Sequence, residues 1–236
     1  NTFRGSRCGD AISTADNNVA VGFNSLGADT KGDRNVALGS AALATQNFTT
    51  TTDVYNVGVG YVAGFSLTTG VQNTLVGGLA GDALTTAGNT VAVGYNALTA
   101  ATTGTFNVAI GSEALAANTT ASFNTAVGGA ALTANTTGSA NNAMGTSALA
   151  SNTTGSNNVA IGNSALEANT TASGNVAIGD QALNDNTTGQ SNTAVGYRAL
   201  DAATTAGDNT AIGTGAMGAT TTGEANTAVG SAVLDA

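Results

Sequence analysis

The 236-residue chain contains no histidine, no proline and no tryptophan, and Cys8 is its only cysteine. Without histidine the chain can form neither a Ser-His-Asp nor a Cys-His catalytic arrangement, and a zinc site would lack its usual ligands. A single cysteine excludes a disulfide framework within the chain. The acidic residues are scattered over unrelated positions. We therefore expect no enzymatic activity, no bound metal and no cofactor.

Charge is also scarce, and one sign dominates. Only 5 basic residues stand against 14 acidic ones, which gives a formal net charge of −9. A nucleic-acid partner would require a basic surface, so this class of ligand is excluded. No run of 18 apolar residues is present, and we expect no membrane insertion by this segment.

The residues that are abundant, including 33 glycines, follow a repeat. The stretch NNVAIGNSALEANTTASGNVAIG, residues 157 to 179, contains N-V-A-I-G twice. Fourteen such copies run from Gly5 to Gly230, aligned on the glycine that closes N-x-A-x-G, here called the motif glycine. Successive motif glycines are 17 residues apart, except for 21 between Gly39 and Gly60. The pattern predicts a single repeat domain, 1–236, with a four-residue insertion near 49–53.

Each copy contains a short β-strand followed by turns. Val-Ala-Ile alternates with period two and is rich in β-branched residues, as in a strand. A coil of 17 residues cannot satisfy its backbone polar groups alone, so it must stack on its neighbours. The spacing fits neither helical repeats of 34 residues nor leucine-rich repeats of 20 to 29. We predict an all-β fold, a parallel β-solenoid of about 14 coils.

Alternation along the strand sends Val and Ile to one side and Ala to the other. We expect the first set, with the leucine four residues after the motif glycine, to form the core: Val21, Leu26, Val93, Leu98, Ile110, Leu115, Ile161, Leu166, Ile178 and Leu183. The alanines would then line an interface between subunits: Ala92, Ala109, Ala126, Ala160, Ala177, Ala194 and Ala211. The alternative orientation places Ala in a narrow interior and leaves Val and Ile to cover another surface.

The N-x-A-[VI]-G motif with a following alanine resembles the head repeats of YadA-like trimeric autotransporter adhesins, and NTVAVG at 89–94 matches them best. It is also similar to N-T-A-x-G arrays in bacterial surface proteins and phage tail fibres. The resemblance implies a left-handed parallel β-roll, three chains around one axis, and attachment to surfaces. The period of 17 is longer than the usual repeat of the adhesin family, and no heptad stalk is present.

The resemblance and the composition together predict an extracellular or cell-surface protein, or part of a phage particle, that acts as a stiff adhesive rod. Its expected partners are further copies of itself, as a homotrimer, and a host-surface protein or glycan. A head-to-tail filament and an ice-binding solenoid, suggested by recurrent Thr-Thr pairs, are the alternatives.

Two sets of residues are candidates for binding or modification. Exposed aromatics directly after the motif glycine could bind a ligand: Phe23, Tyr61, Tyr95 and Tyr197. Asparagines in Asn-Thr-Thr fit the glycosylation pattern N-x-[ST]: Asn118, Asn135, Asn152, Asn169 and Asn186.

Overall fold

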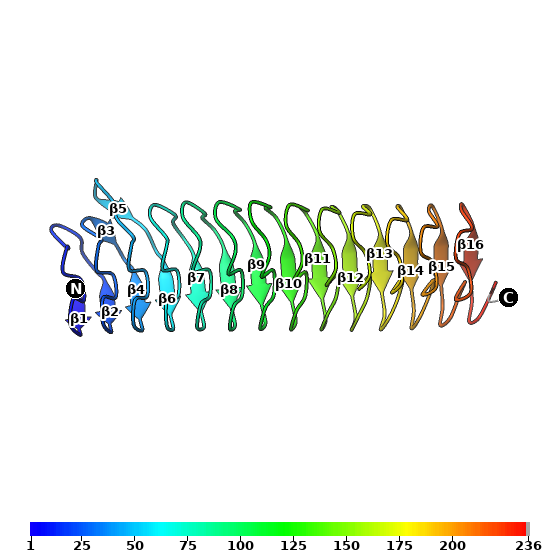
Figure 1. Cartoon of the computed structure of the whole chain (residues 1–236), viewed down its shortest axis with the longest axis horizontal. Coiled ribbons are helices and arrows are strands. Elements are labelled where there is room, and N and C mark those ends of the chain that lie inside the picture. The colour runs from blue at the N-terminus through cyan, green and yellow to red at the C-terminus, as the bar shows by residue number, and fades with distance from the viewer. Residues whose placement is uncertain (235–236) are drawn as a thin grey trace. The chain divides into compact units, whose positions relative to one another are not determined.

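The computed structural model describes residues 1–234 and confirms the predicted parallel β-solenoid with its 17-residue repeat (Figure 1). Short strands alternate with turns, and the described residues contain no helix. The chain divides into two compact units, residues 1–121 and the part that begins at Ser122. The two units are described separately below, and the prediction of one continuous domain stays a prediction.

Each unit contains one parallel sheet in which the strands follow the order of the chain. The first unit has β1 (Thr2–Arg4), β2 (Val19–Val21), β4 (Val36–Leu38), β6 (Val57–Val59), β7 (Thr74–Val76), β8 (Val91–Val93) and β9 (Val108–Ile110). The second has β10 (Thr125–Val127), β11 (Asn142–Met144), β12 (Val159–Ile161), β13 (Val176–Ile178), β14 (Thr193–Val195), β15 (Thr210–Ile212) and β16 (Thr227–Val229).

Successive coils stack in register, so each residue of a repeat lies beside its counterpart in the next. In β12 and β13, for example, Ala160 pairs with Ala177 and Ile161 pairs with Ile178. Neighbouring strands in a sheet lie about 4.8 Å apart, which sets the height of one coil. Any side chain that recurs at one phase of the repeat therefore forms a straight column along its unit.

The four extra residues near 49–53 form a local extension of one coil. There β3 (Gly32–Asp33) and β5 (Thr52–Asp53) pair as a separate two-stranded sheet, which projects beside the main coils of the first unit in Figure 1. Arg34 forms an ion pair with Asp53, and its guanidinium carbon lies 5.6 Å from the centre of the Tyr55 ring. The insertion thus leaves the register of the main sheet unbroken, with Val36 paired to Val57.

The interior of each coil is lined by alanine and leucine, and the expected assignment of the two strand faces is wrong. Five leucines of the expected core are fully buried: Leu26, Leu98, Leu115, Leu166 and Leu183. The β-branched residues expected beside them lie on the outer surface instead, with Val21, Ile110, Ile161 and Ile178 between 37% and 40% exposed and Val93 half-buried. The alanines expected at a subunit interface are completely enclosed within the coil: Ala92, Ala109, Ala126, Ala160, Ala177, Ala194 and Ala211.

The reason for this orientation is the narrow interior. Gly58 occupies the strand centre, two residues before its motif glycine, and a Cβ built there would lie 2.8 Å from Cγ of Leu43. The strand centre therefore faces the leucine of the opposite wall, and only a small side chain fits between them. Two coils carry a large residue at the strand centre, Phe3 and Leu75, and each has a glycine, Gly9 or Gly81, in place of that leucine.

Two columns of buried asparagine connect the coils. In the first asparagine ladder, which lies four residues before the motif glycine, Asn158 Oδ1 accepts from the backbone N–H of Asn175 at 3.0 Å. Its Nδ2 donates to the carbonyl of Ala172 at 2.9 Å. The second asparagine ladder lies seven residues after the motif glycine, and its Asn169 Nδ2 reaches the same carbonyl at 3.2 Å. The second asparagine ladder contains only Asn118, Asn135, Asn152, Asn169 and Asn186. Where both ladders are present, one carbonyl joins them, as the carbonyl of Gly155 joins Asn141 and Asn152.

Asp29 occupies a position equivalent to the second asparagine ladder and is buried. It accepts hydrogen bonds from Gln46 Nε2 at 2.8 Å and from the N–H of Gly32 at 3.1 Å. Burial raises the pKa of the Asp29 carboxyl above its ordinary value of 3.8, because the charged form loses hydration, and the hydrogen bonds oppose this only in part.

The raised pKa of Asp29 predicts a dependence of stability on pH. Because the folded chain binds this proton more tightly than the unfolded chain, the contribution is fully present below the ordinary pKa and is lost as the pH rises through the raised value. The free energy of unfolding of wild type, minus that of Asp29→Asn, should therefore decrease between about pH 3 and about pH 7. Asp180→Asn, at an exposed site, controls for the loss of one acidic group. A difference that increases with pH would contradict the expectation.

Candidate functional site

Each unit exposes one apolar sheet face, formed by the residues three and one before every motif glycine. These are Val, Ile, Thr, Leu, Met or Asn in every strand of the two main sheets except for Arg4. Val19, Ile178 and Ile212 are 37% to 40% exposed on this face. Within each unit the sheet face is therefore a continuous, nearly uncharged strip two side chains wide, with β-branched groups at every coil except that of β11.

The sheet face is hollowed around β11. Asn142 and Met144 replace the usual Val and Ile there, and Met144 is 51% exposed. The hollow has a volume of about 310 Å³ and is lined by Thr125, Asn142, Ala143, Met144, Val159 and Ile161. An unbranched methionine adapts its shape readily, so this coil offers a place where an apolar group from another molecule could insert.

The predicted ligand candidates lie on the surface at the corner that follows the sheet face. Phe23, Tyr61 and Tyr95 in the first unit are 54%, 65% and 57% exposed, and Tyr197 in the second unit is 52% exposed. They share one phase of the repeat, directly after the motif glycine. Their exposure makes them available for contact, while their role in binding stays a prediction.

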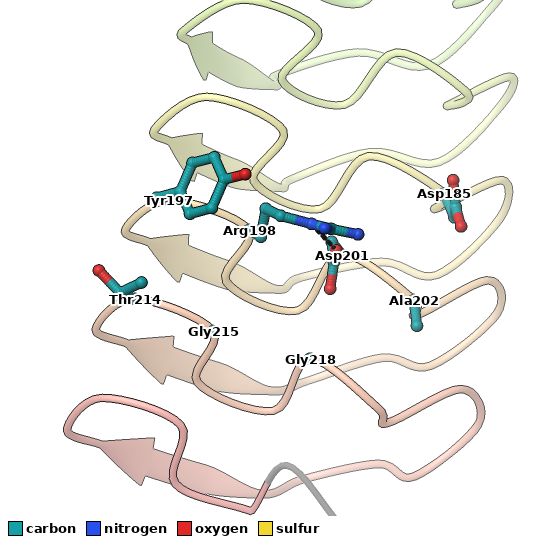
Figure 2. Close-up of a pocket in the computed structure, with 8 residues that line it drawn as sticks. All are labelled: Asp185, Tyr197, Arg198, Asp201, Ala202, Thr214, Gly215 and Gly218. Atoms are coloured by element: carbon teal, nitrogen blue, oxygen red, sulfur yellow. Dashed lines mark hydrogen bonds and ion pairs between the residues drawn. The ribbon is translucent and has the colours of Figure 1, made fainter.

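Tyr197 borders a shallow depression of about 370 Å³ in the second unit (Figure 2). Arg198 Nε donates to Asp201 Oδ2 at 2.6 Å, and Asp185 lies on the other side of the depression. The hydrogen bond and the charge of Asp201 raise the pKa of Arg198. Because Arg198 already has a carboxylate partner, this site offers little to an anionic ligand.

In the Thr-Thr pairs, one threonine side chain bonds to the neighbouring coil and the other faces solvent. The first threonine donates its hydroxyl to the backbone of the next coil, as Thr153 Oγ1 does to the carbonyl of Thr170 at 2.9 Å. The second threonine is exposed, as at Thr154, Thr171 and Thr188. Each of these coils therefore presents one outward threonine from the pair.

The interpretation of the Asn-Thr-Thr asparagines as glycosylation sites is wrong for the folded chain. All five side chains, of Asn118, Asn135, Asn152, Asn169 and Asn186, are fully buried. Within the second unit, Asn152 Nδ2 donates to Asn135 Oδ1 at 2.8 Å, and Asn169 Nδ2 donates to Asn152 Oδ1 at 2.8 Å. The nitrogen that a glycan would modify is therefore enclosed and used in the second asparagine ladder.

Among the described residues, acidic and sulfur-containing side chains do not gather into a further site. No group of three or more His, Cys, Asp or Glu residues within 1–234 could hold a metal ion. Cys8 is buried, and its Sγ lies 3.0 Å from the carbonyl oxygen of Ala20. The described part of the chain also lacks any helix long and apolar enough to cross a membrane.

The sequence-based prediction missed the sheet face, because it directed the Val and Ile side chains of each strand into the core. A signal for it was present in the sequence. Where the residue at the strand centre is large, the residue four places after the motif glycine is a glycine instead of the usual leucine. Phe3 with Gly9 and Leu75 with Gly81 show that these two positions share one interior.

Comparisons with family models, curated proteins and solved structures find no match for this chain.

Proposed function

We propose that this chain is a structural and adhesive segment of an extracellular fibre or surface protein, in which three identical copies associate through their sheet faces. The observation that carries the proposal is the sheet face itself. Its columns of Val, Ile and Thr are half-buried or exposed, although they are almost uncharged. Contiguous apolar surface of this kind marks an interaction site in soluble proteins.

A second copy of the chain is the partner that fits this face best. The face repeats with the height of one coil, and an identical chain offers the same repeat, so contacts made at one coil recur at every other coil. The absence of charge from the sheet face, apart from Arg4, removes repulsion between like copies despite the net charge of −9. The resemblance to YadA-like adhesin heads suggests three copies rather than two.

The adhesive role follows from rigidity combined with multiple copies. Parallel pairing and the two asparagine ladders hold the coils of each unit in register, so a surface on one coil keeps its distance from a surface on the next. Three identical chains would multiply the avidity of any weak binding surface without requiring new contacts. The segment would hold its ligand-binding residues away from the cell or particle that carries it.

Sedimentation velocity over a range of concentrations tests the assembly. We expect a stable species of three chains for wild type and a monomer for the double variant Ile161→Lys/Val195→Lys, because lysine would place charge in the middle of the sheet face. The matched control is Thr154→Lys/Thr188→Lys, which adds the same charges at the same spacing on exposed residues of another wall. This control should still form trimers.

Three outcomes would contradict the proposal. If wild type is a monomer at all concentrations, the sheet face does not mediate assembly. Thermal hysteresis of that monomer would favour ice binding. Open-ended polymers would favour a filament. A double variant at Ile161 and Val195 that assembles as well as wild type would place the interface elsewhere. Circular dichroism confirms that each variant retains its strands.

A further inference from the structure

Three of the exposed aromatic residues of the first unit follow a regular spacing, while Tyr55, Phe65 and Phe106 are exposed at other positions of the repeat. The positions that directly follow the motif glycine are, coil by coil, Phe23, Ser40, Tyr61, Gly78 and Tyr95. The large ring thus occurs on every second coil, and the coil between carries a small residue. Phe23, Tyr61 and Tyr95 are here called the aromatic row.

Backbone hydrogen bonds establish that these five positions are direct neighbours along the first unit. The carbonyl of Phe23 accepts from Ala41 N–H at 2.8 Å, and the carbonyl of Ser40 accepts from Val62 N–H at 2.9 Å. The same contact continues from Leu79 N–H to the carbonyl of Tyr61 at 2.9 Å. The rings are therefore attached two coil heights apart, about 9.6 Å at about 4.8 Å per coil.

The coils between the rings carry small residues, Ser40 and Gly78, at the same position of the repeat. A Cβ built on Gly78 would meet only Cδ2 of Tyr95, at 3.7 Å, so the Tyr95 side chain lies back over the backbone of the preceding coil. Ser40, between the other two rings, is exposed. The aromatic row is thus a line of single rings separated by small residues, which differs from the aromatic-lined groove in which proline-rich peptides bind.

The aromatic row lies on an uncharged strip, and the nearest charged residues at this corner, Arg7 and Glu113, are on the coils just beyond its two ends. The three residues from the motif glycine to two after it contain no acidic or basic side chain in any of the five coils: 22–24, 39–41, 60–62, 77–79 and 94–96. Asn24 and Asn96 place side-chain amides directly after the first and last rings. A ligand for this strip should be neutral, with apolar faces for the rings and hydroxyl groups for the amides.

From this spacing we infer that the aromatic row binds an extended, uncharged β-1,4-linked glycan. The C–H face of a pyranose ring packs on an aromatic ring, and its hydroxyl groups at the edge remain free for hydrogen bonds. Successive sugars of such a glycan turn over, so equivalent faces recur once per disaccharide, a length close to the two-coil step of about 9.6 Å. The three rings would engage alternate sugars of one chain.

The inference deepens the proposed adhesive function by naming a ligand class for it, but the two can fail separately. The motif glycine and its turn separate the aromatic row from the sheet face, so assembly through one leaves the other a distinct surface. A trimer that binds no glycan would overturn only the inference. A monomer that binds glycan would overturn only the proposed assembly.

Calorimetric titration of the full chain with cellohexaose tests the inference. We expect binding of cellohexaose, at least about tenfold weaker binding of cellobiose, which can engage one ring, and no binding of the α-1,4-linked maltohexaose, whose chain curves. Tyr61→Ala should weaken the binding of cellohexaose about tenfold, because it removes the central ring. Tyr197→Ala, in the second unit, is the matched control and should bind as wild type does.

A swap variant tests the spacing itself. Ser40→Tyr/Tyr61→Ser keeps the composition and the number of rings but moves the central ring by one coil, between two exposed positions. It should bind cellohexaose as weakly as Tyr61→Ala. Failure of wild type to bind cellohexaose, equal binding by the swap variant, or preferential binding of a proline-rich peptide would overturn the inference.

Discussion

Replacing Gly128 with alanine is expected to lower the free energy of unfolding by about 3 kcal/mol or more, whereas Gly129→Ala, one residue later, should change it by less than about 1 kcal/mol. Gly128 is a motif glycine with φ of +139°, a backbone conformation that residues other than glycine rarely adopt. A Cβ there would lie 2.6 Å from the carbonyl carbon of Gly145 and even closer to its oxygen. The atoms it meets are backbone of the next coil and cannot move aside without breaking the register.

Gly129 provides the control because a Cβ at that position has nothing within 4 Å. Both variants make the same chemical change in the same turn, so the comparison isolates the close approach of the motif glycines. Urea unfolding followed by circular dichroism measures the difference in unfolding free energy between the two variants. The dependence of that free energy on urea concentration should be the same for both, since a change in this slope would indicate partial unfolding. Equal stability of the two variants would show that the column of motif glycines does not set the distance between coils.

The second large effect is expected in the first asparagine ladder. Asn158→Ala should lower the free energy of unfolding by roughly 2 to 3 kcal/mol, because the buried N–H of Asn175 loses its acceptor. The carbonyl of Ala172 keeps Asn169 as a donor, so the loss falls mainly on Asn175.

Asn163→Ala is the matched control for Asn158→Ala, since Asn163 is an exposed asparagine of the same repeat. It should leave stability within about 0.5 kcal/mol of wild type. Hydrogen exchange at the Asn175 amide gives a direct reading, and its protection should decrease in Asn158→Ala alone. Unchanged protection would mean that the ladder is not what holds this amide.

Several features of the site could be predicted from the sequence because they depend only on the period. The aromatic residues at one phase were identified as exposed ligand candidates, and all four are exposed in the structure. The alternate-coil spacing of the aromatic row follows from the same alignment, once each coil is known to pair directly with the next.

The Asn-Thr-Thr motif shows why other features could not be predicted in this way. As a local pattern it is indistinguishable from a surface glycosylation signal, and nothing within three residues shows that Asn152 points inward. Its burial depends on Asn135 and Asn169, 17 residues away on either side, which occupy adjacent coils and complete its hydrogen bonds. Only the stacked arrangement reveals the ladder.

The sequence alone determined the length of the repeat, the position of its strands and the in-register parallel stacking, because a 17-residue coil has no other way to satisfy its backbone. The tertiary structure alone decided which strand face turns inward. An alternating strand is equally consistent with either orientation, and hydrophobicity favours burying Val and Ile. The interior is too narrow for that choice, since the leucine of the opposite wall leaves room only for alanine at the strand centre, so the larger residues remain outside as the sheet face.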